Sequence, residues 1–237
     1  MAIMKYQAKV ADVEDPNEKF RILRLELIEP SRVEFQAGQY VILFVPGHEE
    51  KRNYSIMSSP AIDHRVELLI DLSPQGIATS YLGGLKPGDL VEFMAPGGMF
   101  VMKEEDLAQE QSLVFVATGS GITPIWSMIQ DLLQVRGDTR PMQLYWGLRH
   151  EKDMMLLTEL EDIQKQFSNI IVHFSLSDPT PEWPLCSGRV TDCLRSHDLP
   201  DSAGYYLCGN QHMLTDVQSV LESRGVSPER IHHEKFY

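Results

Sequence analysis

The sequence has few cysteines, and their spacing excludes one kind of redox centre. Among its 237 residues are three cysteines, Cys186, Cys193 and Cys208, and none of them forms a C-x-x-C pair. A plant-type iron–sulfur cluster needs four closely spaced thiolates, so we expect no such cluster on this chain. An odd number of thiols in a chain without a secretory leader also favours a reducing compartment.

Long apolar runs and an excess of basic residues are missing as well. No apolar run approaches the ~18 residues that a membrane-spanning helix needs, and the N-terminus lacks the basic start and apolar block of a secretory signal. We therefore expect a cytoplasmic protein without membrane insertion. Lys and Arg number 21 against 34 Asp and Glu, which gives a formal charge of −13. This charge disfavours nucleic acid as a partner, because binding phosphates needs a basic face.

The N-terminal part alternates apolar and polar residues in short segments that Gly, Pro and Asp turns separate. The segments are 6–14, 20–29, 41–45, 52–56, 66–72 and 90–94. A period of two is typical of β-strands, and six such strands predict an antiparallel barrel or sandwich. We expect this domain to span 1–102 and a charged linker, 103–111, to follow it.

In the remaining part, 112–237, strands alternate with helices. The apolar run 112–117 is typical of a parallel strand that is covered on both faces. Further strands are expected at 142–147, 170–176, 205–208 and 231–236, and helices at 123–135, 153–167, 190–195 and 213–224. This alternation predicts a doubly wound parallel sheet. Ligands of such sheets bind at the carboxyl ends of the strands, where Gly119, Gly147, Ser175 and Gly209 fall.

The extended stretch Arg52-Asn53-Tyr54-Ser55 has the chemistry of a flavin cradle. Alternation directs Arg52 and Tyr54 to the same face. Arginine offers a fork of donors to a phosphate, and the Ser55 hydroxyl is able to bond a ring nitrogen. The alternative is an ordinary half-buried strand.

Two glycine turns precede helices and predict anion sites. Gly76 leads into one or two helical turns whose backbone N–H groups, with the hydroxyls of Thr79 and Ser80, suit a phosphate. A simple turn that covers the barrel is the alternative. The second turn, 118–121, ends a strand, and Thr123-Pro124 is expected to open the next helix with threonine as its cap. Strand, glycine turn and helix bring backbone donors against a pyrophosphate, although the third glycine of the dinucleotide fingerprint is missing.

Taken together, five motifs give the chain a family resemblance. They are Arg52-x-Tyr54-Ser55, Gly76-x-x-Thr79-Ser80, Gly119-Ser120-Gly121-Ile122-Thr123-Pro124, Cys208-Gly209-Asn210-x-x-Met213 and Glu234-x-Phe236-Tyr237. In this order and spacing, over nearly the whole chain, the sequence resembles the ferredoxin-NADP reductase superfamily. The resemblance implies an antiparallel six-stranded β-barrel that binds FAD and an α/β domain that binds NADH or NADPH. It also implies electron transfer to a separate ferredoxin or flavodoxin-type carrier.

The resemblance assigns roles to individual residues. Those implied to bind FAD are Arg52, Asn53, Tyr54, Ser55, Gly76, Ala78, Thr79, Ser80, Phe236 and Tyr237. Those implied to bind NAD(P) are Thr118, Gly119, Gly121, Thr123, Pro124, Arg149, Ser175, Asp178, Arg189, Cys208, Gly209 and Met213. Ser55, Cys208 and Glu234 are implied to surround the reacting rings as catalytic residues. We expect no metal site, since His232 and His233 face opposite ways in a strand and no third ligand is spaced to join them.

Several alternatives stay open. The chain could instead be a free-flavin reductase, or a non-catalytic electron-transfer or regulatory subunit, and the oligomeric state is not predicted. We expect a preference for NADH, because Asp178 suits ribose hydroxyls and would repel a 2′-phosphate. Arg149 and Arg189 could each favour that phosphate. Phe236 is expected to cover the isoalloxazine ring of the flavin and Tyr237 to stack on the adenine of FAD, which FMN lacks.

Overall fold

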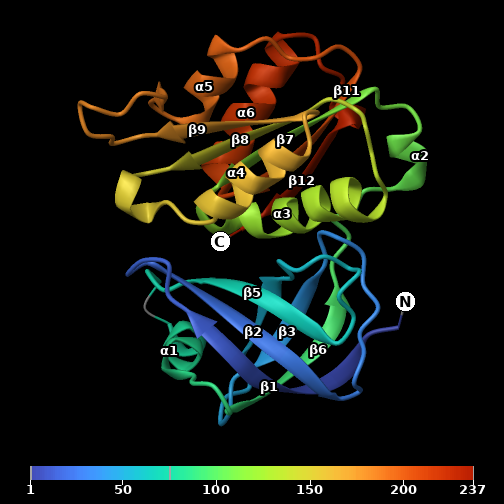
Figure 1. Ribbon diagram of the computed structural model, residues 1–237, viewed down its shortest axis with the longest axis vertical. Coiled ribbons are helices and arrows are strands. Elements are labelled where there is room, and N and C mark those ends of the chain that lie inside the picture. The colour runs from blue at the N-terminus through green and yellow to red at the C-terminus, as the bar shows by residue number, and fades with distance from the viewer. Residues whose placement is uncertain (1, 75, 237) are drawn as a thin grey trace. The chain divides into compact units, whose positions relative to one another are not determined.

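The computed structural model describes residues 2–74 and 76–236. The chain divides into two compact units (Figure 1). The first consists of Met1–Val101 with Trp126–Arg136, and the second of Met102–Ile125 with Gly137–Tyr237. Hydrogen bonds explain why a piece of the later chain joins the first unit: Ser127 Oγ donates to Ser58 O (2.8 Å) and Gln130 Nε2 to Met57 O (2.9 Å).

The first unit contains the predicted six-stranded antiparallel barrel. Its strands are β1 (Met4–Glu14), β2 (Phe20–Glu29), β3 (Tyr40–Phe44), β4 (Lys51–Ser55), β5 (Arg65–Asp71) and β6 (Leu90–Gly97), in the sheet order β4-β3-β6-β1-β2-β5. An antiparallel bridge between Ile56, directly after β4, and Leu68 of β5 joins the two edges of the sheet. The sheet therefore closes on itself, as the barrel prediction requires.

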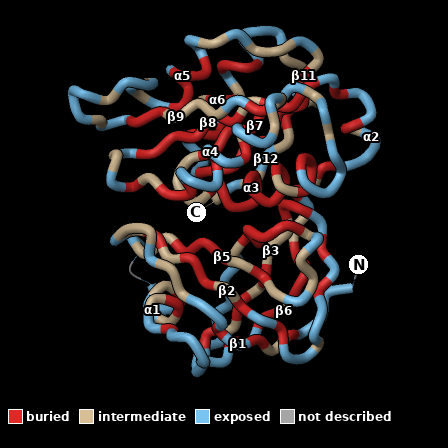
Figure 2. Tube along the Cα trace, in the orientation of Figure 1, coloured by how far each residue is buried: buried red, intermediate tan, exposed pale blue. Residues whose placement is uncertain are grey.

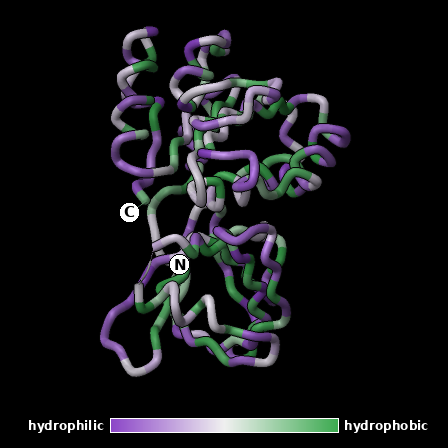
Figure 3. Tube along the Cα trace, turned by 90° about the vertical axis from the view of Figure 1, so that its left-hand side faces the viewer, coloured by the Kyte–Doolittle hydropathy of each residue, from purple (hydrophilic) through white to green (hydrophobic). Residues whose placement is uncertain are grey.

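Period-two alternation accounts for the core of this barrel. In β1 the residues Tyr6, Ala8 and Val10 are buried, while Lys9 is exposed. Figure 2 shows buried and exposed stretches alternating along the strands of the barrel. Helix α1 (Ile77–Gly84) adds Ala78 and Leu82 to the same core. Figure 3 shows hydrophobic and hydrophilic residues following one another at short intervals along the chain in both units.

The second unit contains the predicted parallel sheet. Its strands are β7 (Ser112–Thr118), β8 (Met142–Leu148), β9 (Ile170–Leu176), β10 (Cys186–Ser187), β11 (Ala203–Gly209) and β12 (Ile231–Lys235), in the order β10-β9-β8-β7-β11-β12. Neighbouring strands of this sheet run parallel to each other in each of these pairs. Every residue of β7 from Ser112 to Ala117 is buried, in agreement with its continuous apolar sequence.

Helices cover this sheet as a doubly wound fold requires. They are α2 (Glu104–Leu107), α3 (Ile122–Gln130), α4 (Leu157–Gln166), α5 (Val190–Ser196) and α6 (Gln211–Ser223). Helices α5 and α6 pack with Val114 and Val116 of β7 in one core cluster, so they cover the face to which these alternate residues point. Among the described residues, no helix has the length and apolarity that crossing a membrane requires.

Several sequence predictions were wrong in detail. The helix expected to open at Thr123 begins earlier, with the 3-10 turn η1 (Gly119–Gly121) running into α3 and ending in a π-helical segment, η2 (Asp131–Val135). The helix expected over 153–167 is divided into a 3-10 turn, η3 (Glu151–Asp153), and α4. Strand β10 was missed. The sequence analysis gave no pairing of the cysteines, and in the structure Cys186 and Cys193 form a disulfide.

Candidate functional site

The candidate flavin-phosphate site lies within the first unit, where β4 meets α1. Thr79 and Arg52 both act on the Tyr54 phenol and lower its pKa, Arg52 through its charge and Thr79 through its side chain, but burial has the larger, opposite effect. Burial raises the pKa of Tyr54, so its hydroxyl stays protonated and can donate a hydrogen bond. The structure thus unites Arg52, Tyr54 and Thr79, which the sequence analysis assigned to one ligand.

Helix α1 begins at this group without a side-chain cap. Its N-cap residue is Gly76, which has no side chain to cap the helix. A Cβ built on Gly76 would meet no described atom within 4 Å. The first N–H groups of a helix need partners from outside the helix, and anions supply them well. Ser80 is exposed in the same first turn, while Ala78 is buried in the barrel core.

Arg52 carries a feature that the sequence analysis missed. Its Nη2 atom donates to Glu50 Oε2 at 2.6 Å and its Nη1 atom to Lys51 O at 3.0 Å. Both charged side chains are 53% exposed, so the pair is a surface salt bridge. A phosphate bound by Arg52 would have to compete with Glu50.

Ser55 and Asn53 lie apart from that group. Ser55 is 5% exposed and pairs with Tyr40 of β3, and Asn53 is exposed and pairs with Ile42. Alternation along β4 directs both side chains to the face opposite Arg52 and Tyr54. The structure therefore does not place the Ser55 side chain with Arg52 and Tyr54 at the candidate flavin-phosphate site. The assignment of Ser55 to the flavin ring stays a prediction.

The candidate nucleotide site lies within the second unit, at the carboxyl ends of β7, β8 and β11. Gly119 has a φ of +55° and its carbonyl accepts a hydrogen bond from Trp146 Nε1 (3.1 Å). A Cβ on Gly121 would lie 2.3 Å from Cys208 O. Because that contact is with backbone, only glycine allows the turn after β7 to approach the end of β11 so closely.

A second close contact joins three more of the predicted residues. A Cβ on Gly209 would lie 2.4 Å from Thr118 Oγ1 and 2.3 Å from Met213 Cε. Met213 N donates to Asn210 Oδ1 at 3.0 Å, so Asn210 is the N-cap of α6. That cap explains the asparagine of the motif, and its sequence signal is an asparagine directly before a helix.

Thr123 and Pro124 are buried inside α3 and do not cap it. The Thr123 hydroxyl donates to Ser120 O at 2.7 Å, so it braces the preceding turn. The predicted cap is wrong because the 3-10 turn carries the helix start back to Gly119, where glycine readily accepts the left-handed conformation.

Two of the predicted catalytic residues are neighbours. Cys208 of β11 and Glu234 of β12 are paired in register. Cys208 is fully buried, and burial together with the charge of Glu234 raises the pKa of its thiol. A neutral thiol cannot act as a base or nucleophile. Phe236 follows β12, with its N–H donating to Gly209 O at 2.8 Å. Tyr237 lies outside the described residues, and Ser55 belongs to the first unit.

The residues expected to choose between NADH and NADPH carry partners of their own. Asp178 Oδ2 lies 3.9 Å from Arg149 Nε and 3.6 Å from His150 Nδ1. Arg189 Nη1 lies 3.3 Å from Asp216 Oδ2. The sequence analysis gave no role to His150 or Asp216, since neither is close to its partner in sequence.

Ser175 has an unusual environment at the end of β9. Its side chain is 1% exposed, and its Oγ atom is buried without a hydrogen-bond partner among the residues described. A Cβ on Gly147 would lie 3.4 Å from that oxygen. Buried hydroxyls almost always have a hydrogen-bond partner. The Ser175 hydroxyl, which has none among the described residues, can therefore bond to a ligand at these strand ends.

Comparisons with known proteins agree with this division of roles. Residues 7–102 match the model of the oxidoreductase FAD-binding domain, and 115–219 match the oxidoreductase NAD-binding domain. The reductase component of propane 2-monooxygenase from Gordonia sp. (strain TY-5) is 30% identical over 241 residues, which cover 99% of this chain and 68% of that protein. The phenol hydroxylase P5 protein of Acinetobacter pittii (strain PHEA-2) is 33% identical over 239 residues, covering 99% and 66%.

A solved structure shows the same architecture. The Amycolatopsis cytochrome P450 reductase GcoB superposes with a TM-score of 0.90 at 30% identity, over 99% of this chain and 70% of that one. Ferredoxin-NADP+ reductase from Plasmodium falciparum shares the fold with a TM-score of 0.80 at 20% identity, over 98% of this chain and 96% of that one. The chain spans about two thirds of the length of the curated relatives, as the 68% and 66% coverages state.

Proposed function

Because the chain belongs to the ferredoxin reductase-like family of FAD- and NAD(P)H-binding oxidoreductases, we propose that it passes electrons from NADH to a separate one-electron carrier protein. The acceptor in this proposal is of the ferredoxin or flavodoxin type. Flavin supplies the conversion of a two-electron hydride donor into single electrons. The remaining work of binding, orienting and excluding water belongs to the protein's own residues.

The observation that carries the proposal is the group of Arg52, Tyr54 and Thr79 beside the uncapped start of α1. Arg52 offers a guanidinium, Tyr54 a phenol, and the start of α1 backbone N–H groups that no side chain caps. Each is a donor that favours an anion, and together they fit a flavin phosphate. The FAD-binding match over 7–102 includes all of them.

In the second unit, backbone and small side chains would take the nicotinamide nucleotide. The close approach of Gly121 to the end of β11 places the turn after β7 at the strand ends, where its backbone N–H groups would face the pyrophosphate. The orphan hydroxyl of Ser175 offers one hydrogen bond at the same strand ends. Cys208 would act as a neutral thiol that packs against the nicotinamide, and Glu234 would orient it. Ser55 is retained as the proposed hydrogen-bond partner of the flavin ring.

A preference for NADH is part of the proposal. Both arginines that could bind a 2′-phosphate already lie beside carboxylates, Arg149 beside Asp178 and Arg189 beside Asp216. A 2′-phosphate would have to displace or repel these acids, whereas ribose hydroxyls can donate to Asp178. We also retain the cytoplasmic location expected from the sequence.

The proposal is tested with the purified protein. We expect it to retain a yellow flavin that chromatography identifies as FAD, to oxidise NADH with ferricyanide, and to reduce an added ferredoxin or flavodoxin. A colourless protein that reduces added flavins with saturation kinetics would make it a free-flavin reductase instead. Failure to oxidise NADH with any acceptor, in a protein that holds FAD, would favour the non-catalytic subunit.

A further inference from the structure

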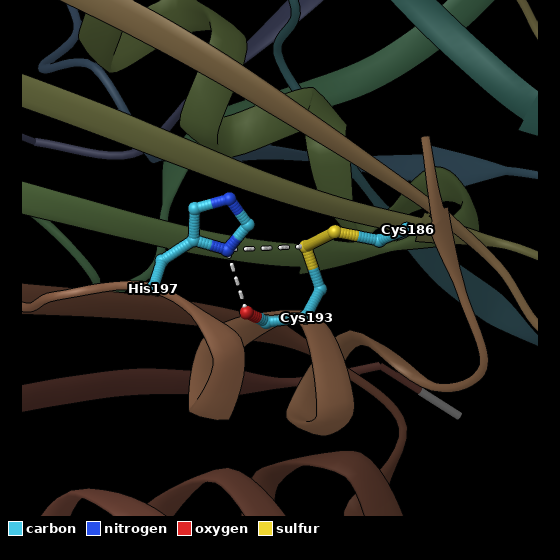
Figure 4. A group of neighbouring side chains, drawn as sticks. All are labelled: Cys186, Cys193 and His197. Atoms are coloured by element: carbon cyan, nitrogen blue, oxygen red, sulfur yellow. Dashed lines mark hydrogen bonds between the residues drawn. A yellow bond between two sulfur atoms is a disulfide. The ribbon is translucent and has the colours of Figure 1, made fainter. Parts of the chain in front are cut away.

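A cluster of two cysteines and a histidine lies outside the sites described above. Cys186 of β10 and Cys193 of α5 form a disulfide with a Cα–Cα distance of 5.6 Å, within the usual range of about 4.4 to 6.8 Å. Figure 4 shows His197 beside this bond, with its Nδ1 atom directed at Cys193. Nδ1 lies 3.9 Å from Cys193 Sγ and 2.8 Å from Cys193 O.

The two cysteines differ in exposure. Cys186 is partly exposed, whereas Cys193 is 2% exposed. An incoming thiolate can therefore reach the Cys186 side of the bond, and Cys193 becomes the leaving group. His197 is the C-cap residue of α5 and follows the helix directly, four residues after Cys193. A ring N–H at this position stabilises a thiolate as it forms.

The disulfide fixes a short edge strand. Strand β10 has two residues, Cys186 and Ser187, which pair with Ser175 and Leu176 at the end of β9. Gly188 N adds one hydrogen bond to Leu176 O (2.8 Å). So short a strand has little stability of its own, and the bond to Cys193 ties it to α5. The strand borders Ser175, which the proposed function assigns to the nucleotide.

We propose that Cys186–Cys193 is a redox-active disulfide that a dithiol reductant opens at Cys186, and that opening it weakens nucleotide binding by releasing β10 from α5. The first thiolate of the reductant bonds to Cys186 Sγ, the Cys186–Cys193 bond breaks, and its electron pair leaves on Cys193 Sγ beside His197. The second thiol of the reductant then displaces Cys186. In total the dithiol is oxidised to a disulfide, and the two cysteines gain two electrons and two protons.

The thiol chemistry stands independently, while the effect on binding rests on the proposed function. The first experiment follows alkylation by mass spectrometry in the holoprotein across a series of dithiothreitol potentials. We expect Cys186 and Cys193 to be blocked before reduction and modified together after it. His197→Gln should slow reduction about tenfold, the effect of losing one hydrogen bond to a charged sulfur. His64→Gln, an exposed histidine of the first unit, is the control and should leave the rate unchanged.

The same assay can overturn the chemistry. Full alkylation of both cysteines without reductant would do so, most directly if one equivalent of zinc co-purifies, because two thiolates and an imidazole form a metal-binding set. An unchanged reduction rate in His197→Gln would refute the role of His197. Resistance of the bond to dithiothreitol at every potential in the native protein would refute its redox activity.

The second experiment measures NADH binding by calorimetry, which does not depend on turnover. Reduction should raise the NADH Kd about two- to tenfold, because a released segment must be ordered again on binding. The Cys186→Ser/Cys193→Ser double variant should show the raised Kd and no response to dithiothreitol. Equal Kd values for the oxidised and reduced forms would refute the coupling. Absence of NADH binding in both forms would instead count against the proposed function, and the alkylation result would still stand.

Discussion

The Arg52–Glu50 pair gives the sharpest test of the flavin-phosphate site. Arg52 Nη2 lies 2.6 Å from Glu50 Oε2, and both side chains are 53% exposed. Such a surface pair is worth about 0 to 1 kcal/mol. A charge-assisted bond from Arg52 to a phosphate is worth about 1.5 to 3 kcal/mol. The phosphate should therefore displace Glu50 from the guanidinium. The net gain is about 0.5 to 3 kcal/mol over the full ranges and about 1 to 2 kcal/mol near their middle.

Two variants should then change FAD affinity in opposite directions. Arg52→Ala is expected to raise the FAD Kd about five- to thirtyfold, which is the same net energy expressed as a ratio. Glu50→Gln removes the competitor and a nearby negative charge, so it should lower the Kd about two- to fivefold. The gain in Glu50→Gln should shrink as salt is raised, because exposed charges are screened.

The assay is titration of the apoprotein with FAD, followed by quenching of flavin fluorescence. Arg32→Ala is the matched control, because Arg32 is also an exposed arginine of the first unit with an acidic partner, Asp63. It should leave the Kd unchanged. An unchanged Kd in Arg52→Ala, or a weaker affinity in Glu50→Gln, would show that Arg52 does not meet the flavin phosphate.

Further substitutions test the other assignments. Cys208→Ala should slow flavin reduction by NADH in stopped-flow measurements while FAD content stays at the wild-type level, and a wild-type rate would remove Cys208 from the reaction. Ser175→Ala should raise the NADH Kd about tenfold or less and leave the unfolding midpoint unchanged, since its hydroxyl has no described partner to lose. Asp178→Ala should raise kcat/KM for NADPH relative to that for NADH. An unchanged ratio would show that Asp178 does not discriminate against the 2′-phosphate. Burial and the neighbouring His197 lower the pKa of His173 from 6.5 to about 4. In that interval the unfolded chain binds a proton that the folded chain does not, so stability should fall as the pH is lowered from about 6.5 to about 4. In His173→Gln this dependence should be shallower, and parallel stability curves would contradict the assignment.

The sequence predicted those parts of the molecule that local periodicity and glycine chemistry determine. Alternation in β1 and the continuous apolar run of β7 each follow from the faces that their residues bury. The glycine turn after β7 was assigned to a nucleotide, and the 2.3 Å approach of a Cβ on Gly121 to Cys208 O shows why glycine is required there. These features depend on residues close in sequence or on one dominant strand pattern.

The predictions failed where the structure depends on partners distant in sequence or on very short elements. Strand β10 has two residues, too few to show a period, and it exists through its pairing with β9. The disulfide could not be inferred because connectivity does not follow from cysteine spacing. Thr123 was taken for a cap from its position before proline, but a 3-10 turn competes for the same residues and moved the start of the helix.

Acidic partners of arginines recur at both candidate sites, with opposite consequences. Arg52, Arg149 and Arg189 each lie within 4 Å of a carboxylate, and each pair is exposed. An exposed ion pair of this kind contributes about 1 kcal/mol or less. The neighbouring acid alone therefore does not decide whether a phosphate binds to the arginine. At Arg52 the phenol of Tyr54 and the uncapped start of α1 add further donors, and a helix start contributes about 0.3 to 1 kcal/mol toward an anion. Arg189 also stands at a helix start, that of α5, but there its N–H already donates to the Asp192 carboxylate at 2.9 Å. Asp178 and Asp216 remain to repel a 2′-phosphate. Convergence of donors, rather than the presence of an arginine, therefore separates the site that should take a phosphate from the one that should reject it.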